Sequence, residues 1–450
     1  MYKLLAGFLL IASVTLQAQD TLVTFTLFLG DTIEVTREAL PDSLPDSLPD
    51  SLPDSLPGSL PEALPDSLPE ALPDSLPDSL PDSSRGKILF HPGPIPFVLN
   101  VAPFSMWVSI DSASAPPELL PLQLRKDTLC IIGTGDIMLG TNYPSALYLP
   151  PGEDCSPLLR PVHTILQSGD LLFGNLEGGF GNKGGTPKAC KDTTSCYVFR
   201  MPEHFAGCLV EAGYDVLSVA NNHVNDFGRE GRESTALLLD SVGIAYAGFE
   251  THPWTIFEKG GVTYGFAAFA PNKGTMDMKD YRGAARITAM LDSLADVVII
   301  SFHGGAEGKD HQHVVRGDEE YLGQNRGSVF RFAHDVVDAG ADVVFGHGPH
   351  VTRALELYKD RLICYSLGNF ATYQRFNLSG PNGIAPIVKV NVNRDGAFLS
   401  GEVIPIHQPG EGGPRPDAQK RAIYKIMELS RADFPDQRLV VGVDGSLSVK

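Results

Sequence analysis

The sequence predicts an α/β domain, and three observations lead to this prediction. Short apolar runs alternate with helical patterns from about residue 127 onward, which is typical of α/β domains. The later part of this region is rich in strands, which indicates a mixed sheet or a second sheet. Polar residues follow several of the apolar runs, at the position where ligands bind in such folds.

The predicted domain covers residues 126–408. The expected strands are 128–132, 171–173, 216–220, 244–247, 264–270, 297–302, 343–345, 362–366, 387–392 and 397–405, and the expected helices are 157–167, 203–212, 234–241, 284–294 and 329–339. Residues 409–450 are rich in glycine and proline at first, and then predict a helix over 418–430 and a strand over 438–443. We treat this last segment as a C-terminal extension that packs on the domain.

The residues before the domain form four segments. Residues 1–19 match a secretory signal peptide, because Lys3 precedes an apolar stretch and cleavage fits after Ala18. An uncleaved anchor is the alternative, although the apolar stretch is shorter than the roughly 20 residues of a membrane-spanning helix. We therefore expect export to the periplasm, the cell envelope or the extracellular space. Residues 20–39 are expected to form a short strand or ordered lead-in.

A tetrapeptide repeat, Leu-Pro-Asp-Ser with Glu-Ala variants, fills most of residues 40–84. Proline at every fourth position forbids a helix and removes backbone donors, and the acidic residues repel one another. We expect this segment to be an extended, disordered linker. Residues 85–125 are rich in proline but too apolar for a pure linker, so we expect them to pack on the domain as irregular chain.

The charge of the chain argues against nucleic acid as a partner. The net charge is −19, and residues 40–84 contribute −10 of it, which leaves −9 for the rest. The sequence shows no basic stripe that could neutralise phosphates. Contact with a membrane is expected only through an uncleaved N-terminal segment.

Six cysteines stand in this chain, which we expect to be exported. Cys190 and Cys196 bracket a short polar loop, and we predict a disulfide between them. Cys130 and Cys364 lie in strand-like runs, Cys208 in a helical pattern and Cys155 in a loop. For these four we expect buried or free thiols.

Five predicted strands are followed directly by residues of the kind that bind metals. These residues are Asp136, then Asn175 and Glu177, then Asn222 and His223, then His303 and Glu307, and finally His347 and His350. A single Asp or Asn after a strand is more often a turn or helix-capping residue. If the strands lie side by side, however, their ends converge, and these carboxylate, amide and imidazole groups would suit a divalent metal ion.

Several of these residues suggest specific roles. Asn222 can bind a metal through its carbonyl oxygen, while the adjacent His223 could protonate a leaving oxygen. We assign catalytic roles to His223, Asp226 and Glu307, although Glu307 could equally be a metal ligand, a carboxylate that orients an imidazole, or a solvated loop residue. Ser366 and Asn369, which follow the last histidine pair, are assigned to substrate binding.

The ordered motifs resemble those of the CapA family of poly-γ-glutamate capsule biosynthesis proteins. They are Gly135-Asp136-Ile137-Met138-Leu139-Gly140, Gly174-Asn175-Leu176-Glu177-Gly178, Ala220-Asn221-Asn222-His223, Ser301-Phe302-His303-Gly304-Gly305 and Gly346-His347-Gly348-Pro349-His350. The resemblance covers roughly residues 127–407. It implies the calcineurin-like metallophosphoesterase fold, a four-layer α/β/β/α sandwich with two mixed sheets and a metal site at the strand ends.

Carried over by this resemblance, Asp136 is the first metal ligand, Asn222 and His223 are the Asn-His pair, and His303 and His347 are later ligands. The sequence also departs from the phosphoesterase pattern. Asn175 stands where a bridging aspartate is usual, with Glu177 two residues on, and no histidine follows Asp136 at the usual spacing. The order of residues 346–350 leaves open whether His347 or His350 is the ligand.

The resemblance implies an exported protein of envelope poly-γ-glutamate metabolism with a metal-dependent hydrolase or transferase site. One or two divalent ions are expected, and the sequence does not distinguish Mn, Zn, Fe and Mg. The reaction would be attack by water on a phosphoester or on an amide such as a γ-glutamyl bond. The expected partners are an anionic envelope polymer or its precursor and other capsule synthesis proteins. Two alternatives are a non-catalytic component that binds the polymer or assembles a synthesis complex, and a purely structural role for all five strand ends.

Overall fold

The structure is a computed structural model that describes residues 127–189 and 197–450 in full and six N-terminal strands by their backbone. The chain divides into two units, Met1–Leu80 and Pro81–Lys450. The first unit contains an antiparallel sheet of β1 (Ala12–Ala18), β2 (Thr21–Leu27) and β3 (Ile33–Ala39). The predicted signal peptide lies partly, and the repeat linker 40–84 entirely, outside the described residues.

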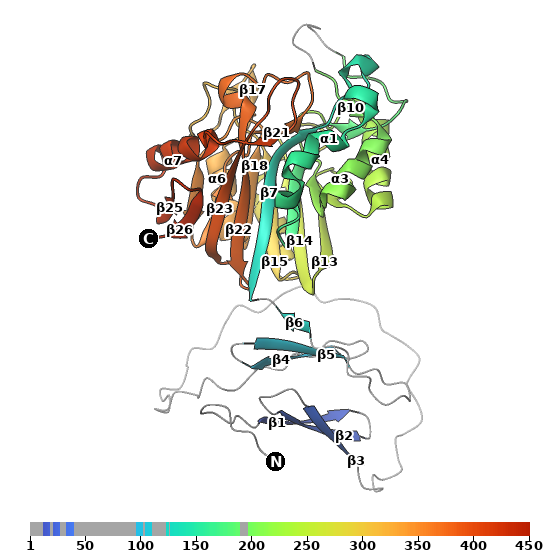
Figure 1. Cartoon of the computed structure of the whole chain (residues 1–450), viewed down its shortest axis with the longest axis vertical. Coiled ribbons are helices and arrows are strands. Elements are labelled where there is room, and N and C mark those ends of the chain that lie inside the picture. Colours follow the sequence, from blue (N-terminus) through green and yellow to red (C-terminus); the bar gives the residue numbers. More distant parts are fainter. Residues whose placement is uncertain are drawn as a thin grey trace, which may run out of the picture. The chain divides into compact units, whose positions relative to one another are not determined.

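The second unit begins with a small antiparallel sheet of β4 (Pro96–Val101), β5 (Phe104–Ser109) and β6 (Gln123–Arg125). These strands fall in the Pro-rich segment that we expected to be irregular. The remaining elements, from β7 onward, form two large sheets with helices on their outer faces (Figure 1).

The larger sheet has the order β12-β11-β8-β7-β22-β23-β26-β25, with β21 also paired to β7 and β24 to β23. Its strands are β7 (Thr128–Met138), β8 (Leu171–Leu176), β11 (Val216–Ser218), β12 (Ala245–Ala247), β21 (Asn369–Thr372), β22 (Ile384–Asn393), β23 (Phe398–His407), β24 (Arg415–Pro416), β25 (Leu439–Val441) and β26 (Ser446–Val449). Strands β12, β11, β8, β7 and β21 are parallel, whereas β22 and β23 run antiparallel, so the sheet is mixed.

The second sheet has the order β13-β14-β15-β18-β20-β19. Its strands are β13 (Trp254–Lys259), β14 (Val262–Phe269), β15 (Val297–His303), β18 (Val343–His347), β19 (Leu355–Tyr358) and β20 (Arg361–Cys364). The four inner strands are parallel, and the antiparallel strands β13 and β19 form the two edges. Two short pairs lie outside these sheets: β9 (Gly179–Phe180) with β10 (Arg200–Met201), and β16 (Glu320–Tyr321) with β17 (Gln324–Asn325).

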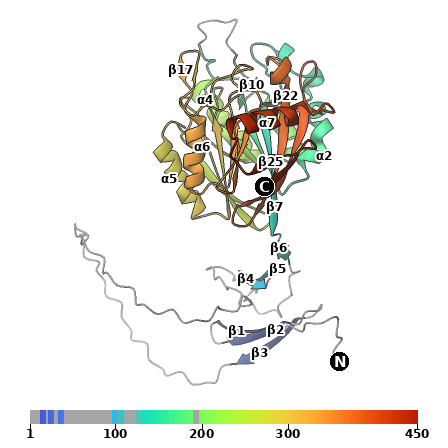
Figure 2. The same ribbon diagram turned by 90° about the vertical axis from the view of Figure 1, so that its left-hand side faces the viewer.

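The two sheets pack face to face through a buried apolar layer. Phe173 of β8 stacks on Phe345 of β18 with ring centroids 4.8 Å apart, and Phe266 of β14 packs beside them. Helices α1–α4 cover the outer face of the larger sheet, and α5 and α6 cover that of the smaller one. Figure 2 shows α5 and α6 on one side of the sheets and α2 on the other. This arrangement confirms the predicted α/β/β/α sandwich with two mixed sheets.

The helices begin and end where local chemistry permits. They are α1 (Ser156–Leu159), α2 (His163–Leu166), α3 (Ala206–Ala212), α4 (Gly228–Val242), α5 (Tyr281–Asp292), α6 (Val329–Asp338) and α7 (Arg421–Asp433). Asp280 and Ser328 cap α5 and α6 by accepting backbone N–H groups, as N-cap residues do. The single helix predicted over 157–167 is wrong: a 3₁₀ turn separates α1 from α2, because Pro161 has no N–H to donate.

The C-terminal segment is part of the sandwich. Strand β26 pairs with β23, and β25 pairs with β26, so residues beyond 409 extend the larger sheet. Helix α7 buries Ile423 and Ile426 in the layer between the sheets. No helix among the described residues has the length and apolar character that a membrane span requires.

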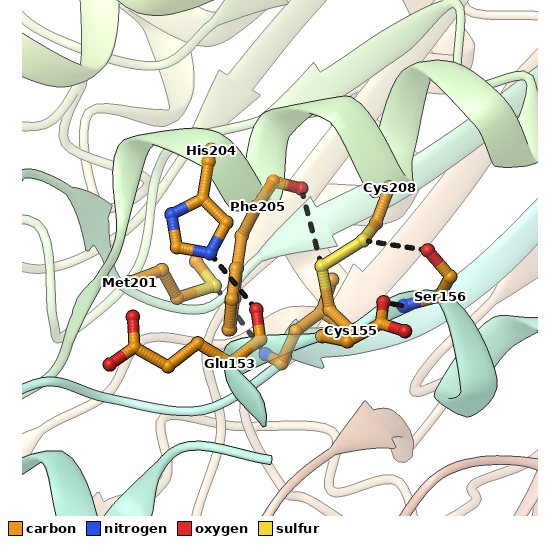
Figure 3. The surroundings of a disulfide bond; sticks show 9 residues. Glu153, Cys155, Ser156, Met201, His204, Phe205 and Cys208 are labelled. Carbon is orange, nitrogen blue, oxygen red and sulfur yellow. Dashed lines mark hydrogen bonds between the residues drawn. A yellow bond between two sulfur atoms is a disulfide. The ribbon is translucent and has the colours of Figure 1, made fainter. Parts of the chain in front are cut away.

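A disulfide joins Cys155 to Cys208, 53 residues apart in sequence, and ties the start of α1 to α3 (Figure 3). Our expectation of thiols at these two positions is therefore wrong. The pairing depends on α1 packing beside α3, which spacing in the sequence does not reveal. Cys364 is a buried thiol, as expected. The predicted pair Cys190 and Cys196 lies outside the described residues.

Candidate metal centre

Ligand-type side chains converge at the carboxyl ends of the parallel strands of both sheets. In the larger sheet Asp136 of β7 lies opposite Asn175 of β8, and in the smaller sheet His303 of β15 lies opposite His347 of β18. Glu177 follows β8 directly. We expected Asp136 to follow its strand, but it lies within β7. This strand continues to Met138, past an irregularity in its pairing with β8.

Asp136 and Glu177 are held side by side by one amide group. Nδ2 of Asn175 donates to Oδ1 of Asp136 and to Oε2 of Glu177, at 2.8 Å in each case. The other oxygen of Asp136 lies 2.8 Å from Nδ1 of His350. Asn175 thus contributes a neutral donor between two carboxylates, at the position where phosphoesterases place a bridging aspartate.

Several buried polar atoms at this point have no hydrogen-bond partner among the described residues. They are both ring nitrogens of His303, both ring nitrogens of His347, and Oε1 of Glu177. The side chains of these residues are fully buried. Leaving such atoms unpaired costs about 1–3 kcal/mol each. The arrangement is therefore that of a binding site whose ligand would satisfy these atoms.

Glu177, His303 and His350 each offer a ligand atom, and the three atoms lie within 4.8 Å of one another. Nδ1 of His303 is 3.5 Å from Oε2 of Glu177, and Nε2 of His350 is 4.0 Å from Oε1. Two imidazoles and a carboxylate suit a borderline divalent cation such as Zn, Mn or Fe. The residues present therefore fit a metal ion.

Burial and neighbouring charges shift the pKa values of the residues of this centre, some upward and some downward. Burial, with the nearby charge of Asp136, raises the pKa of Glu177 to about 8. Burial alone would raise the pKa of Asp136, but the imidazoles of His347 and His350 hold it below its ordinary value. Burial opposes the charged form of His350, yet Asp136 raises its pKa to about 10. Burial keeps the pKa of His303 well below its ordinary value, so this imidazole is neutral and able to bind a metal.

The structure brings both candidate histidines of the 346–350 turn to Asp136. Nδ1 of His347 lies 3.3 Å from Oδ1 and Nδ1 of His350 lies 2.8 Å from Oδ2. Gly348 has φ +113°, and a Cβ there would lie 2.6 Å from the carbonyl oxygen of Gly304. Only glycine fits this turn, which allows residues three positions apart to face the same carboxylate.

The loop after β11 supplies a histidine and aspartate pair beside the cluster. Nδ1 of His223 lies 2.7 Å from Oδ2 of Asp226, and Nε2 lies 3.9 Å from Oε1 of Glu177. Asp226 also accepts the backbone N–H of Phe199 at 2.6 Å and pairs with Lys188 at 2.5 Å. These contacts fix the imidazole so that Nε2 faces the cluster. Burial lowers the pKa of His223 despite the neighbouring Asp226.

The two asparagines before His223 have different surroundings. Asn221 is fully buried; its Nδ2 donates to the carbonyl oxygen of Leu176 at 2.7 Å, and its Oδ1 accepts from the N–H of His223 at 3.0 Å. It therefore holds the loop against β8. Oδ1 of Asn222 is buried without a partner among the described residues, so this oxygen is available as a ligand.

The remaining predicted residues lie near the cluster with differing contacts. Glu307 pairs with Arg326 at 3.1 Å. Asn369 donates to the carbonyl oxygens of His350 and Asn382, and its Oδ1 has no partner among the described residues. Ser366 is buried, and its hydroxyl accepts the N–H of Gly368, which makes it a turn residue in this structure.

Sequence reasoning missed an aromatic border to the centre. Phe199 stacks on His223 with centroids 4.2 Å apart, and Phe376 stacks on Phe199 at 5.2 Å and meets His350 edge-on at 5.9 Å. Neither phenylalanine follows a strand in a recognisable motif. Only the three-dimensional contacts reveal them.

Residues 130–374 match the family described as "Bacterial capsule synthesis protein PGA_cap". The chain is 26% identical to "Capsule biosynthesis protein CapA" of Bacillus anthracis over 343 residues, which cover 72% of this chain and 76% of that protein. It is 27% identical to "PGA biosynthesis protein CapA" of Bacillus subtilis over 381 residues, which cover 81% of this chain and 93% of that protein.

Among solved structures, purple acid phosphatase from yellow lupin seeds aligns with 72% of this chain and 60% of its own, at 9% identity and a TM-score of 0.33. A TM-score this low establishes by itself neither a shared fold nor a shared function. The family match covers more than half of the sequence and includes the motifs that build the centre. The chain belongs to the bacterial capsule synthesis protein PGA_cap family.

Proposed function

We propose that this protein acts in envelope poly-γ-glutamate metabolism through a metal-dependent hydrolase or transferase site. The observation that carries the proposal is a set of buried atoms without a hydrogen-bond partner among the described residues, namely the ring nitrogens of His303 and His347 and Oε1 of Glu177. Evolution rarely leaves such atoms unsatisfied in a core unless a ligand binds them. The names of the Bacillus relatives support the polymer as the substrate class.

Glu177, His303 and His350 would hold the ion, with Asp136, His347 and the Asn222 oxygen as further ligands. A bound divalent ion would supply Lewis-acid polarisation of the group to be cleaved. A side chain of the protein would transfer the proton. Asp226 occupies Nδ1 of His223, so Nε2 is the atom that gives a proton to the leaving group or takes one from water.

We further propose that the protein is exported. A disulfide such as Cys155–Cys208 is typical of proteins that fold in oxidising compartments. The N-terminal sequence supports the same conclusion, since it matches a signal peptide that is either cleaved or kept as an anchor. The partners would then be the anionic polymer or its precursor and other capsule synthesis proteins of the envelope.

One observation favours a second candidate, a non-catalytic protein that binds the polymer or assembles a synthesis complex. The Asn175 amide donates to both Asp136 and Glu177, so a neutral side chain stands at the position where the phosphoesterase pattern has a bridging aspartate. Two cations held close together need negative charge between them. This arrangement favours one ion over two and weakens the likeness to dinuclear phosphoesterases.

Elemental analysis of the purified protein, combined with assays on phosphodiester and γ-glutamyl substrates, separates these candidates. The enzyme proposal predicts bound metal and turnover of one substrate class, with turnover lost in His223→Ala and metal retained. Metal-loaded protein without turnover under any divalent ion would support the binding role. Protein that binds no metal and turns over neither substrate would contradict the enzyme proposal.

A further inference from the structure

A short segment after β21 borders the candidate metal centre and carries an arginine that pairs with no carboxylate in the described part of the chain. The segment is residues 374–376. Its Phe376 ring contacts His350 and Phe199, and Phe199 stacks on His223. Phe376 therefore lies against the candidate ligand His350 and is linked through Phe199 to the proton-transfer residue His223.

The guanidinium of Arg375 contacts two tyrosine rings. Its Cζ lies 4.7 Å from the centroid of Tyr148 and 5.0 Å from that of Tyr197. Among the described residues it forms no ion pair with a carboxylate, and its Nε is buried without a hydrogen-bond partner. A guanidinium stacked in this way is weakly hydrated and fixed in position, and it retains donors for a planar anion.

The backbone beneath Arg375 is held in a conformation that most residues avoid. Gln374 and Arg375 have φ of +49° and +56°, and neither is glycine. Glu411 holds this turn: its carbonyl oxygen accepts the N–H of Gln374 at 2.7 Å, and its carboxylate accepts the hydroxyl of Tyr373 at 2.8 Å. Strain of this kind is retained where the surrounding structure enforces it, and such sites are often functional.

A second arginine, next to Phe199 in the chain, has only neutral hydrogen-bond partners among the described residues. Arg200 follows Phe199 in the chain, and its guanidinium donates to the side-chain oxygen of Asn142 and to the carbonyl oxygen of Gly184, each at 2.8 Å. Both partners are neutral. The Cζ of Arg200 lies 4.4 Å from the centroid of the Phe227 ring. Arg200 is therefore a second positive charge in this region that pairs with no carboxylate among the described residues.

We propose that Arg375 is a specificity-determining residue that binds the free α-carboxylate of a γ-linked glutamate unit beside the metal centre. This inference rests on the proposed function. A γ-linked chain keeps one α-carboxylate on every residue, and the planar fork of arginine matches a carboxylate in bidentate geometry. Arg200 would strengthen the local positive field.

The test compares a soluble γ-linked glutamate oligomer with the same oligomer carrying α-carboxamides, using calorimetry on metal-replete full-length protein. Arg375→Gln should weaken binding of the acid form by about tenfold or more, because one charge-assisted contact is lost. The amide form should bind the wild-type protein about as weakly as the acid form binds Arg375→Gln. The affinity for the amide form should not fall further in Arg375→Gln. The affinity of Arg375→Lys for the acid form should lie between those of wild type and Arg375→Gln, because lysine keeps the charge but lacks the planar fork of arginine.

Arg286→Gln is the matched control, since it removes the same charge from an exposed position on α5 and should leave binding unchanged. Circular dichroism and metal content confirm that each variant is folded and loaded. Acid-form binding that is the same in Arg375→Gln and wild type would overturn the proposal, and a purely packing role for Arg375 predicts that result. Binding of neither oligomer by wild type would also overturn it, as would Arg375-dependent binding of inorganic phosphate alone. Metal content and substrate turnover decide separately whether the proposed function fails too.

Discussion

Polar side chains stand at both ends of the parallel strands, but the two ends differ in how these side chains are hydrogen-bonded. At the amino ends, an aspartate precedes each of β8, β11, β15 and β18, and each accepts a backbone N–H from the neighbouring strand at 2.8–2.9 Å; these are Asp170, Asp215, Asp296 and Asp342. At the carboxyl ends, His303, His347 and Glu177 keep buried atoms that have no partner among the described residues. Satisfied polar groups stabilise a fold, whereas unsatisfied ones indicate a ligand.

The largest effect is expected from removing the imidazole of His303, whose ring nitrogens have no hydrogen-bond partner among the described residues. His303→Leu replaces two buried nitrogens by carbon of similar volume, so metal affinity should fall at least about 100-fold, because a direct ligand is lost. The urea midpoint of the metal-free protein should stay the same or rise, since no hydrogen bond is broken. Elemental analysis and urea unfolding measure the two effects. A large loss of stability in metal-free His303→Leu would mean that the carboxyl end is structural as well.

The histidine that we assign to proton transfer should behave differently. His223 is oriented by Asp226, so His223→Ala should lower turnover by about 10²–10⁴-fold and leave the metal content close to that of wild type. Turnover of the substrate class identified for wild type, measured beside metal content, tests this. Equal loss of metal and activity would place His223 among the ligands instead.

At the opposite end, Asp215→Ala should act on stability alone. Its Oδ2 accepts the N–H of Leu172 at 2.8 Å, and its carboxylate pairs with the half-exposed Lys259. Loss of the buried contact should lower the free energy of unfolding by about 1–3 kcal/mol, with little added by the exposed pair. Metal content should not change. An Asp215→Ala protein that is stable but deficient in metal would contradict the claim that the amino ends serve stability alone.

The last expected effect is confined to a narrow pH range and concerns Asp342. Burial raises its pKa to about 6, despite the N–H of Val298 and the guanidinium of Arg361. The folded state therefore binds this proton more tightly than the unfolded state, whose pKa is near 3.8, so the contribution of Asp342 to stability falls as pH rises from about 4 to 6. Asp342→Asn should remove up to about 3 kcal/mol of this fall. Urea unfolding of both proteins at pH 4 and 7 measures it; parallel curves would contradict the assignment.

The sequence predicted most of the sandwich, since apolar periodicity located the inner strands and helices α3–α6. It also predicted that Asp136, Asn175, Glu177, His303 and His347 would meet, because parallel strands bring their carboxyl ends to one edge. The disulfide Cys155–Cys208, the double donation by Asn175 and the border of Phe199 and Phe376 were not predicted. Each depends on contacts between distant segments, which leave no periodic signal in the chain.

Strand direction distinguishes the two ends, and it would have allowed one more prediction from the sequence. Asp170, Asp215, Asp296 and Asp342 all stand directly before predicted strands, while the candidate ligands stand at or after strand ends. A carboxylate that precedes a parallel strand can cap its neighbour, and one that follows it faces the ligand edge. The sequence alone therefore held a criterion for separating structural from functional aspartates.

The most direct test is anomalous X-ray diffraction from crystals of the protein loaded with manganese or zinc. We expect a peak at the absorption edge of the metal within bonding distance of Glu177, His303 and His350. A peak at another place in the molecule, or fully loaded crystals with these three side chains still unoccupied, would contradict it.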